Sequence, residues 1–258
     1  MGWRHQQATC YLFVQKCYWW LCQRLLRARL VDDRNLINMH TVRRVGGVDI
    51  SFVKGSETDA CACLVVVDVD TLEVLHSQCR SVTMTAPYVP GYLAFREVAF
   101  LRQLVDELRA SAPLMIPDVI LVDGNGVLHP NRFGLACHLG VLCGIPTVGV
   151  GKSLHYVDGL SKERMQQLSK TLHQRGDFVP LVGASGAVWG ALLRTSEPAQ
   201  GTSASKPVVI SVGHGLCLSS AIDLVRKCTR HRIPEPVRHA DLCSRAWLRK
   251  CGASAYEL

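Results

Sequence analysis

The sequence contains no two cysteines spaced as C-x-x-C, although 12 of its 258 residues are cysteine. Most zinc-binding modules need such closely spaced pairs, so the pattern argues against a structural zinc site. No secretory signal is visible, and several cysteines lie in apolar runs, where a free thiol behaves as a small hydrophobic group. We therefore expect reduced thiols and an intracellular location. The cysteines are Cys10, Cys17, Cys22, Cys61, Cys63, Cys79, Cys137, Cys143, Cys217, Cys228, Cys243 and Cys251.

Long apolar runs are also missing. The longest fall far short of the roughly 20 residues needed to cross a bilayer, so no membrane association is expected. An apolar fraction of 48% is still enough for a hydrophobic core, and the length fits one compact domain with or without an appendage. No internal repeat is visible. The net charge of +8 is compatible with a polyanionic partner but does not by itself indicate one.

Acidic residues are absent from the first 31 positions, which carry several arginines and aromatic residues. An Arg-rich, acid-free start is typical of a mitochondrial transit peptide, but this segment also lacks serine. The run Tyr18-Trp-Trp-Leu21 fits a helix that packs on the domain equally well. We favour a divergent basic segment over residues 1–40, with mitochondrial targeting as the weaker alternative.

Hydrophobic periodicity predicts an α/β domain with a mixed sheet. Residues 44–81 alternate with period two or are β-branched, which indicates three strands in a meander. The rest of the chain alternates short apolar runs with segments of helical period. Further strands are predicted at 118–122, 146–150 and 208–212; helices at 91–110, 132–143, 219–230 and 237–250; and a loop at 195–206.

Three acidic residues occupy positions where a carboxylate is unexpected. Asp49 lies in the middle of a strand, where aspartate is disfavoured. Asp123 ends a buried strand before Gly-Asn-Gly, although Asp-Gly is also a common turn pair. Glu97 lies on or beside the apolar stripe of its helix, where it needs a cation or must reach solvent.

These acids would converge if the strands of Asp49 and Asp123 are neighbours. Carboxylates gathered at one point repel each other unless a hard cation joins them, and oxygen-only ligands favour Mg²⁺ or Mn²⁺. Such an ion lowers the pKa of a bound water and neutralises charge on a phosphate. The pattern therefore favours a Mg²⁺ or Mn²⁺ site with open positions for phosphate oxygens and water.

At these residues the chain resembles the endonuclease V family. The resemblance runs from about residue 44 to 245, with six motifs in the family's order, which is far more specific than any one motif. The motifs are VGGVDIS (45–51), PYVPGYLAFRE (87–97), DGNGVLHPNR (123–132), GVGKS (149–153), SVGH (211–214) and RIPEP (232–236). Residues 41–250 are accordingly expected to form the catalytic domain, and 251–258 a short tail.

The resemblance implies a ribonuclease H-like fold with a mixed five-stranded sheet flanked by helices. It also implies that Asp49, Asp123 and Glu97 hold Mg²⁺, or Mn²⁺ in its place. Asp241 matches a fourth ligand position, although it could equally be an acid in the first turn of a helix. Lys152 and His129 match positions near the scissile phosphate; His129 could instead be a structural hydrogen bonder.

Other matched positions are implied to bind the substrate. The segment Pro87-Tyr88-Val89-Pro90 resembles the family's strand-separating wedge, which inserts at a base step and exposes the target base. A base pocket is implied around it, although the glycines there could equally be turn and helix-packing residues. Its residues are Gly91, Leu93, Gly126, Gly134, Leu135, His138, Gly151 and Ser153. His214 is a weaker candidate that could only satisfy buried backbone.

Two further features bear on the ligand. Gly151-Lys152-Ser153 ends like a phosphate-binding P-loop, but Pro146 stands where that motif needs glycine, so a nucleotide triphosphatase is disfavoured. Residues 226–250 contain eight Lys or Arg and two acids, an excess that could grip phosphates or simply form a solvated helical face.

We therefore expect an endonuclease that hydrolyses the phosphodiester 3′ to inosine in single-stranded RNA, with deoxyinosine in DNA as a further substrate. The alternative is a non-catalytic protein that binds inosine-containing RNA. The expected protein is monomeric and cytoplasmic, nuclear or nucleolar.

Overall fold

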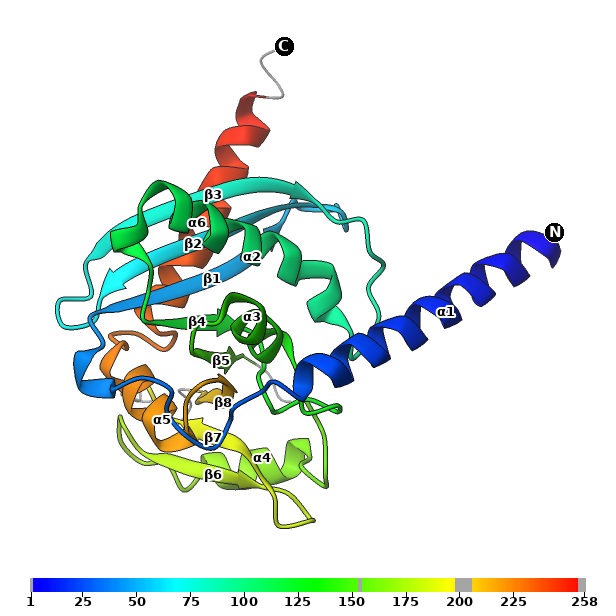
Figure 1. The fold of residues 1–258 in the computed structure, drawn as a ribbon. Coiled ribbons are helices and arrows are strands. Elements are labelled where there is room, and N and C mark those ends of the chain that lie inside the picture. Colours follow the sequence, from blue (N-terminus) through cyan, green and yellow to red (C-terminus); the bar gives the residue numbers. More distant parts are fainter. Residues whose placement is uncertain (1, 153–154, 198–205, 255–258) are drawn as a thin grey trace.

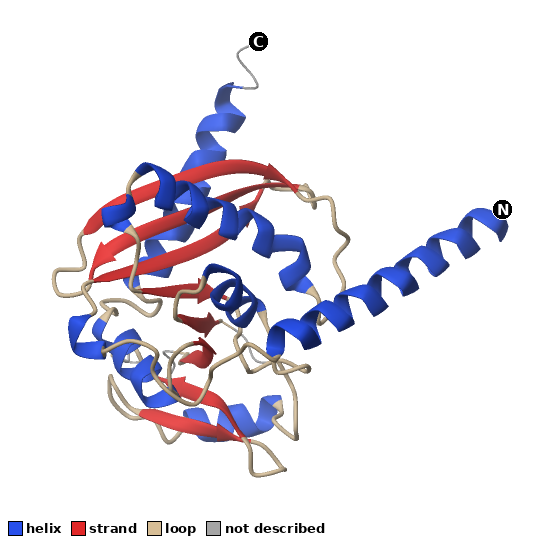
Figure 2. Ribbon diagram, viewed as in Figure 1, coloured by secondary structure: helices blue, strands red, loops and turns tan. Residues whose placement is uncertain are grey.

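One mixed sheet of eight strands forms the centre of the molecule in this computed structural model, which describes residues 2–152, 155–197 and 206–254 (Figures 1 and 2). The strand order is β3-β2-β1-β4-β5-β8-β7-β6, and only the β1–β4 and β4–β5 pairs are parallel. The strands are β1 (Arg44–Phe52), β2 (Asp59–Asp68), β3 (Val74–Thr83), β4 (Val119–Asp123), β5 (Thr147–Gly151), β6 (Phe178–Val182), β7 (Val188–Leu193) and β8 (Val208–His214).

The predicted α/β class is correct, but the predicted count of five strands is wrong. Five neighbouring strands, in the order β3-β2-β1-β4-β5, form a unit of the predicted size. The sheet is then extended beyond β5 by the antiparallel strands β8, β7 and β6. The hairpin of β6 and β7 has little sequence signal because Pro180 interrupts its first strand. Proline cannot donate to the ladder and is tolerated here because β6 is the edge of the sheet.

Helices cover both faces of the sheet (Figure 1). On one face the apolar cores of α2 and α3 pack against β1, β2 and β4; on the other, α5 and α6 pack against β1, β2, β5 and β8. The described helices are α1 (Gly2–Arg27), α2 (Leu93–Ser111), α3 (Leu135–Cys143), α4 (Lys162–Ser169), α5 (Leu218–Lys227) and α6 (Glu235–Ser254). None of them is long and apolar enough to span a membrane. The sequence patterns had missed α4.

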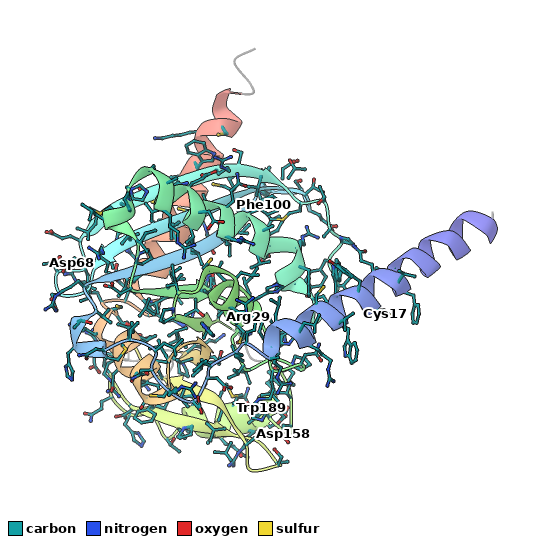
Figure 3. The ribbon with its side chains drawn as sticks, viewed as in Figure 1. Cys17, Arg29, Asp68, Phe100, Asp158 and Trp189 are labelled. Atoms are coloured by element: carbon teal, nitrogen blue, oxygen red, sulfur yellow. The ribbon has the colours of Figure 1, made fainter. Side chains whose placement is uncertain are left out.

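The hairpin end of the sheet has its own small core. Trp189 of β7 is buried and donates a hydrogen bond from its indole nitrogen to Asp158 Oδ2 at 2.8 Å (Figure 3). Asp158 also accepts from the Ser185 hydroxyl at 2.5 Å, which ties the β6–β7 turn to the segment before α4.

The first helix projects from the body of the molecule, and its C-terminal part packs against α2 and the loop before α3 (Figure 1). Trp19 is buried and stacks on Phe95 of α2, with ring centroids 5.3 Å apart. Gln23 is also buried and donates to the Phe133 carbonyl at 2.8 Å. The run around Trp19 thus belongs to a helix that packs on the domain, as its sequence suggested.

Candidate active site

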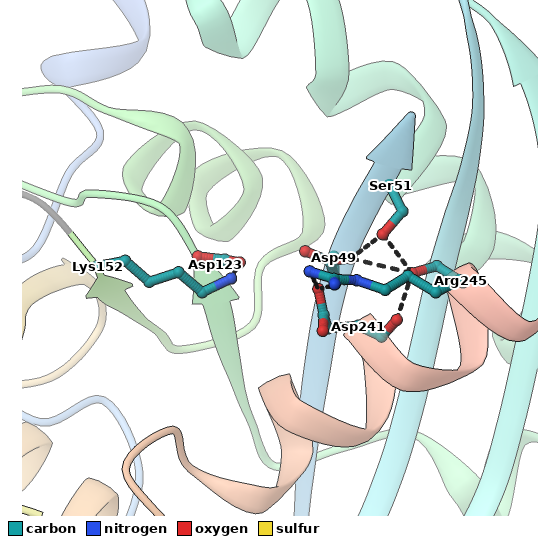
Figure 4. Close-up of polar contacts among 7 residues, drawn as sticks. Asp49, Ser51, Asp123, Lys152, Asp241 and Arg245 are labelled. Carbon is teal, nitrogen blue, oxygen red and sulfur yellow. Dashed lines mark hydrogen bonds and ion pairs between the residues drawn. The ribbon is translucent and has the colours of Figure 1, made fainter. Parts of the chain in front are cut away.

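Asp49 within β1 and Asp123 at the carboxyl end of β4 lie side by side, just beyond the point where the parallel pairing of the two strands ends. The register of β1 and β4 pairs Val48 with Val122, so the two aspartates follow the last pair together. Lys152 comes directly after β5, the next strand of the sheet, and its ammonium lies 2.6 Å from Asp123 Oδ2 (Figure 4). The strands of Asp49 and Asp123 are therefore neighbours, which the sequence alone had left undecided.

Asp49 is buried and faces α6. It accepts hydrogen bonds from the hydroxyls of Ser51 and Ser244, each at 3.1 Å (Figure 4). Burial, and then the neighbouring charge of Asp123, raise the pKa of Asp49 to about 6. The two serines hold the carboxylate but supply no positive charge.

Glu97 reaches the same place from α2. Its side chain is buried, and burial raises its pKa to about 7, opposed by the charge of Arg96 and supported by those of Asp49 and Asp123. Burial and the two neighbouring acids outweigh the charge of Arg96, so the Glu97 anion is only partly compensated. This is the electrostatic environment of a site that binds a positive ion.

Asp241 lies on α6, near Asp49, and its charge adds to the rise in the pKa of Asp49. Its carboxylate is held by the Arg245 guanidinium, with contacts of 3.0 and 2.8 Å to one oxygen (Figure 4). No three acidic, histidine or cysteine side chains among the described residues already stand in a metal-binding arrangement. Lys152 and Arg245 instead bind two of the four acids that the resemblance implied.

Gly47 explains how α6 comes to lie over the acids. A methyl group added at Gly47 would lie 2.1 Å from the backbone carbonyl of Pro236, so glycine permits the first turn of α6 to touch β1. Glu235, buried at the same point, binds His231 at 2.7 Å and Arg238 at 3.3 Å. The VGGVDIS and RIPEP motifs therefore meet, and their contact positions Asp241 and Ser244.

We expect Gly47→Ala to destabilise the protein by about 2–4 kcal/mol, because the added carbon collides with backbone that cannot rotate away. Activity of the folded fraction should fall as well, because α6 must shift. Urea unfolding and cleavage assays would measure both effects. Gly55→Ala is the control: its methyl would meet nothing within 4 Å, so only the strain of a positive φ should appear.

A cleft of about 710 Å³ opens beside Asp123 and Lys152. It is lined by most of the residues implied to bind substrate. Among them are Tyr88, Pro90, Gly91, Leu93, Gly134, Leu135, Gly151 and His129. Pro87 is exposed beside it and Val89 is buried, whereas Ser153 lies outside the described residues. Tyr88 is 65% exposed and lines both this cleft and a second one beside Glu97.

Two implied pocket residues lie away from the cleft lining. His138 is buried in α3, where its ring packs edge-on against Phe95 with centroids 4.9 Å apart. Burial lowers the pKa of His138 to about 4. Gly126 is enclosed too: a methyl there would lie 1.9 Å from the Val212 carbonyl. Gly126 serves packing here, the alternative left open for the glycines, and the substrate-binding roles of Gly126 and His138 stay predictions.

His129 connects the cleft wall to the wedge segment. Its Nδ1 accepts the Asn131 backbone N–H at 3.2 Å, and a hydrogen bond joins the ring to the backbone of Gly91. Burial, and then the nearby His155, lower the pKa of His129 to about 4. A neutral ring with both nitrogens engaged positions the loop rather than carrying a proton. His214 likewise accepts the Val31 N–H at 3.3 Å, in the backbone role considered for it.

Several site residues were missed by sequence reasoning. Ser51 and Ser244 hold Asp49, and Arg245 holds Asp241, but serine and arginine are too common in strands and helices to be singled out. Asn125 lines the cleft, and its Oδ1 is buried without a hydrogen-bond partner in the described part of the chain. Its place in the DGNG motif was the only signal available.

A sheet that gathers acids beside a lysine, next to a cleft with an exposed tyrosine, fits the class of phosphodiester hydrolases. The endonuclease V family model matches residues 26–242, and the chain belongs to this family; it is an endonuclease. Human endonuclease V is 52% identical over 210 residues, which are 81% of this chain and 73% of the human protein.

The solved structures agree with this assignment. The catalytic domain of human endonuclease V superposes with a TM-score of 0.88 at 46% identity, over 93% of this chain and 98% of that one. Endonuclease V of Ciona intestinalis, solved with a 24mer DNA containing an inosine followed by a ribo-adenosine, gives a TM-score of 0.83 at 33% identity, over 92% and 99% of the two chains.

Proposed function

We propose that this protein hydrolyses the phosphodiester bond 3′ to inosine in single-stranded RNA, with deoxyinosine in DNA as a further substrate, and that it requires Mg²⁺. The observation that carries the proposal is the convergence of Asp49, Asp123 and Glu97 just beyond the last paired residues of β1 and β4. The inosine-containing DNA bound by the Ciona relative supports the choice of base.

The donor set fits a hard divalent ion. Asp49, Asp123 and Glu97 offer only oxygen atoms, and the raised pKa values of Asp49 and Glu97 support a bound cation that would stabilise their anions. Asp241 would join them after exchanging its contact with Arg245. When bound, Mg²⁺ or Mn²⁺ would lower the pKa of water and neutralise charge on phosphate.

Lys152 has a separate part in this proposal. Burial lowers its pKa, but the hydrogen bond to Asp123 and the surrounding acids raise it further, so the side chain stays an ammonium. The Nζ atom of Lys152 donates a hydrogen bond to Asp123 Oδ2 at 2.6 Å, and the Lys152 side chain lines the cleft. A cation fixed there can stabilise the negative charge that develops on the phosphate oxygens during hydrolysis.

The cleft beside these residues suits an extruded purine. Gly134 and Leu135 line it, and Asn125 at the cleft wall would have to turn its buried, unpaired Oδ1 outward to accept a base N–H. Inosine carries the N1–H that adenine lacks and lacks the 2-amino group of guanine, so an acceptor would disfavour adenine and limited space would disfavour guanine. The basic residues of α5 and α6 would contact flanking phosphates.

Cleavage assays test the proposal. The protein is incubated with single-stranded RNA and DNA that contain inosine, or adenosine at the same position, with Mg²⁺, with Mn²⁺ or with chelator. We expect one cut, 3′ to inosine, only with a divalent ion and faster in RNA. Retention of inosine RNA without any cut in Mg²⁺ or Mn²⁺ would instead favour the binding protein.

Replacing Tyr88 by alanine should weaken substrate capture by roughly 5–100-fold, because an exposed ring that stacks at a base step contributes on the order of 1–3 kcal/mol. The single-turnover rate at saturating substrate should change much less, since the ring lies outside the acid cluster. Tyr88→Phe keeps the ring and is the control. Unchanged affinity of the alanine variant would remove Tyr88 from the wedge.

We also propose, from the basic charge and the many unpaired thiols, that the protein acts as a monomer in the cytoplasm or nucleus, including the nucleolus. Gel filtration and imaging of the tagged full chain would test this.

A further inference from the structure

We propose that the groove between α1 and the loop after β4 is a second subsite for single-stranded nucleic acid, which binds a stretch of the substrate strand flanking the cut. This inference rests on the proposed nuclease function. It concerns a part of the chain that lies mostly before residue 26, where the family match begins.

The groove adjoins the central cleft. Its volume is about 530 Å³, and its lining includes Trp20, Gln23, Arg24 and Arg27 from α1, together with Pro130 and Asn131 from the loop. The last two residues also line the cleft beside Asp123 and Lys152. A strand leaving the active site over the Pro130–Asn131 ridge would therefore enter the groove.

Both walls are fixed relative to the active site. Trp19 stacks on Phe95, in the helix that also carries Glu97. Asn131 donates to Gln23 Oε1 at 2.7 Å, and Arg27 donates to the Asn131 carbonyl at 3.2 Å. The groove is thus preorganised, which reduces the entropy lost when a flexible strand binds.

The chemistry of the groove fits a polyanion with flat bases. Trp20 is 47% exposed, and the Arg24 guanidinium lies 5.0 Å from its ring centroid. An exposed aromatic ring beside arginines is the combination that stacks bases and contacts phosphates without sequence preference.

The charge of the groove is not cancelled locally. Among the described residues that line the groove none is acidic, and the first 31 residues of the sequence contain no Asp or Glu. The C-terminal end of α1 offsets only about half a charge, less than the two guanidinium groups carry. An apolar partner would find its surface elsewhere on α1, where Phe13, Val14 and Leu25 are exposed outside the groove.

Affinity for strands of two lengths tests the subsite in the full chain without divalent ions. A long inosine RNA of about 25 nucleotides can fill both sites, whereas a short one of about 6 can fill little beyond the cleft. We expect Trp20→Ala to weaken binding of the long RNA by roughly 5–100-fold and of the short one less than twofold. Trp20→Phe should retain most of the affinity.

Two further measurements distinguish the loss of a charged contact from a disturbed fold of α1. Arg24→Ala and Arg27→Ala should each reduce the slope of log K against log salt for the long RNA by about 0.7. Leu25→Ala, on an exposed face of the same helix, is the matched control and should bind like the wild type. Circular dichroism checks that α1 remains helical in every variant.

If Trp20→Ala weakened the binding of long and short RNA equally, or of neither, the proposed subsite would be overturned. Binding of anionic phospholipid vesicles that depends on Trp20, with RNA affinity unchanged, would overturn it in favour of a membrane surface. If the wild type cuts neither RNA in Mg²⁺ or Mn²⁺, the proposed nuclease function fails. If it cuts both while Trp20→Ala leaves long-RNA binding intact, only the subsite fails.

Discussion

Asp49→Asn should reduce the cleavage rate by a factor on the order of 1,000 or more, with substrate affinity largely retained. The change removes the negative charge that would hold the divalent ion but preserves the shape of a buried side chain contacted by Ser51 and Ser244. Single-turnover kinetics on an inosine-containing strand, in saturating Mg²⁺, would measure the effect.

The control is Asp223→Asn, which removes an exposed carboxylate whose side chain is 72% accessible. It should cut at the wild-type rate. An Asp49→Asn variant that also cut at the wild-type rate would remove Asp49 from the mechanism and, with it, the main support for the acid cluster.

Asp49 and Glu97 should stabilise the metal-free protein less and less as pH rises from about 4 to 7, whereas His129 and His138, whose pKa values are lowered to about 4, act in the opposite direction. Burial raises the pKa of Asp49 to about 6 and that of Glu97 to about 7, whereas both are near 4 in an unfolded chain. A raised pKa means that the folded state favours the protonated acid, so this stabilisation is complete below pH 4 and is lost as pH rises through 6 and 7.

Each pKa unit corresponds to about 1.4 kcal/mol, so the contribution of the two acids to the free energy of unfolding should fall by several kcal/mol across this range. Urea unfolding in chelator at several pH values, in the wild type and in variants that lack one acid, would measure it. In Asp49→Asn and Glu97→Gln the free energy of unfolding should fall less, or rise more, with pH than in the wild type. An unfolding free energy in those variants with the same pH dependence as the wild type would contradict the assignment.

Divalent ions should act in the opposite sense. Mg²⁺ or Mn²⁺ binds the ionised acids of the folded state, so each should raise the melting temperature at pH 7.5 more than at pH 5. Asp49→Asn should lose most of that increase. An equal increase in this variant would place the ion elsewhere.

Much of the site could be predicted because its residues violate local preferences. Asp49 inside a strand and Asp123 at the end of a buried strand are unfavourable for packing, and such exceptions indicate function. Lys152 could be identified by resemblance of the GVGKS motif, and its ion pair with Asp123 fits that assignment.

The remaining features depend on contacts between distant segments. The edge hairpin of β6 and β7 was missed because Pro180 weakens its strand pattern, although the sheet edge tolerates it. The enclosure of His138 and Gly126 could not be foreseen either, since neighbours from other elements, such as Phe95 and Val212, create it.

The sequence alone determined the alternation of strands and helices and the identity of the acids, because periodicity and misplaced charges are local properties of the chain. Only the tertiary structure decided that β1 and β4 are neighbours, that α6 brings Asp241 and Ser244 over Asp49, and that α1 forms a basic groove beside the cleft. These arrangements result from long-range packing, which no local pattern encodes.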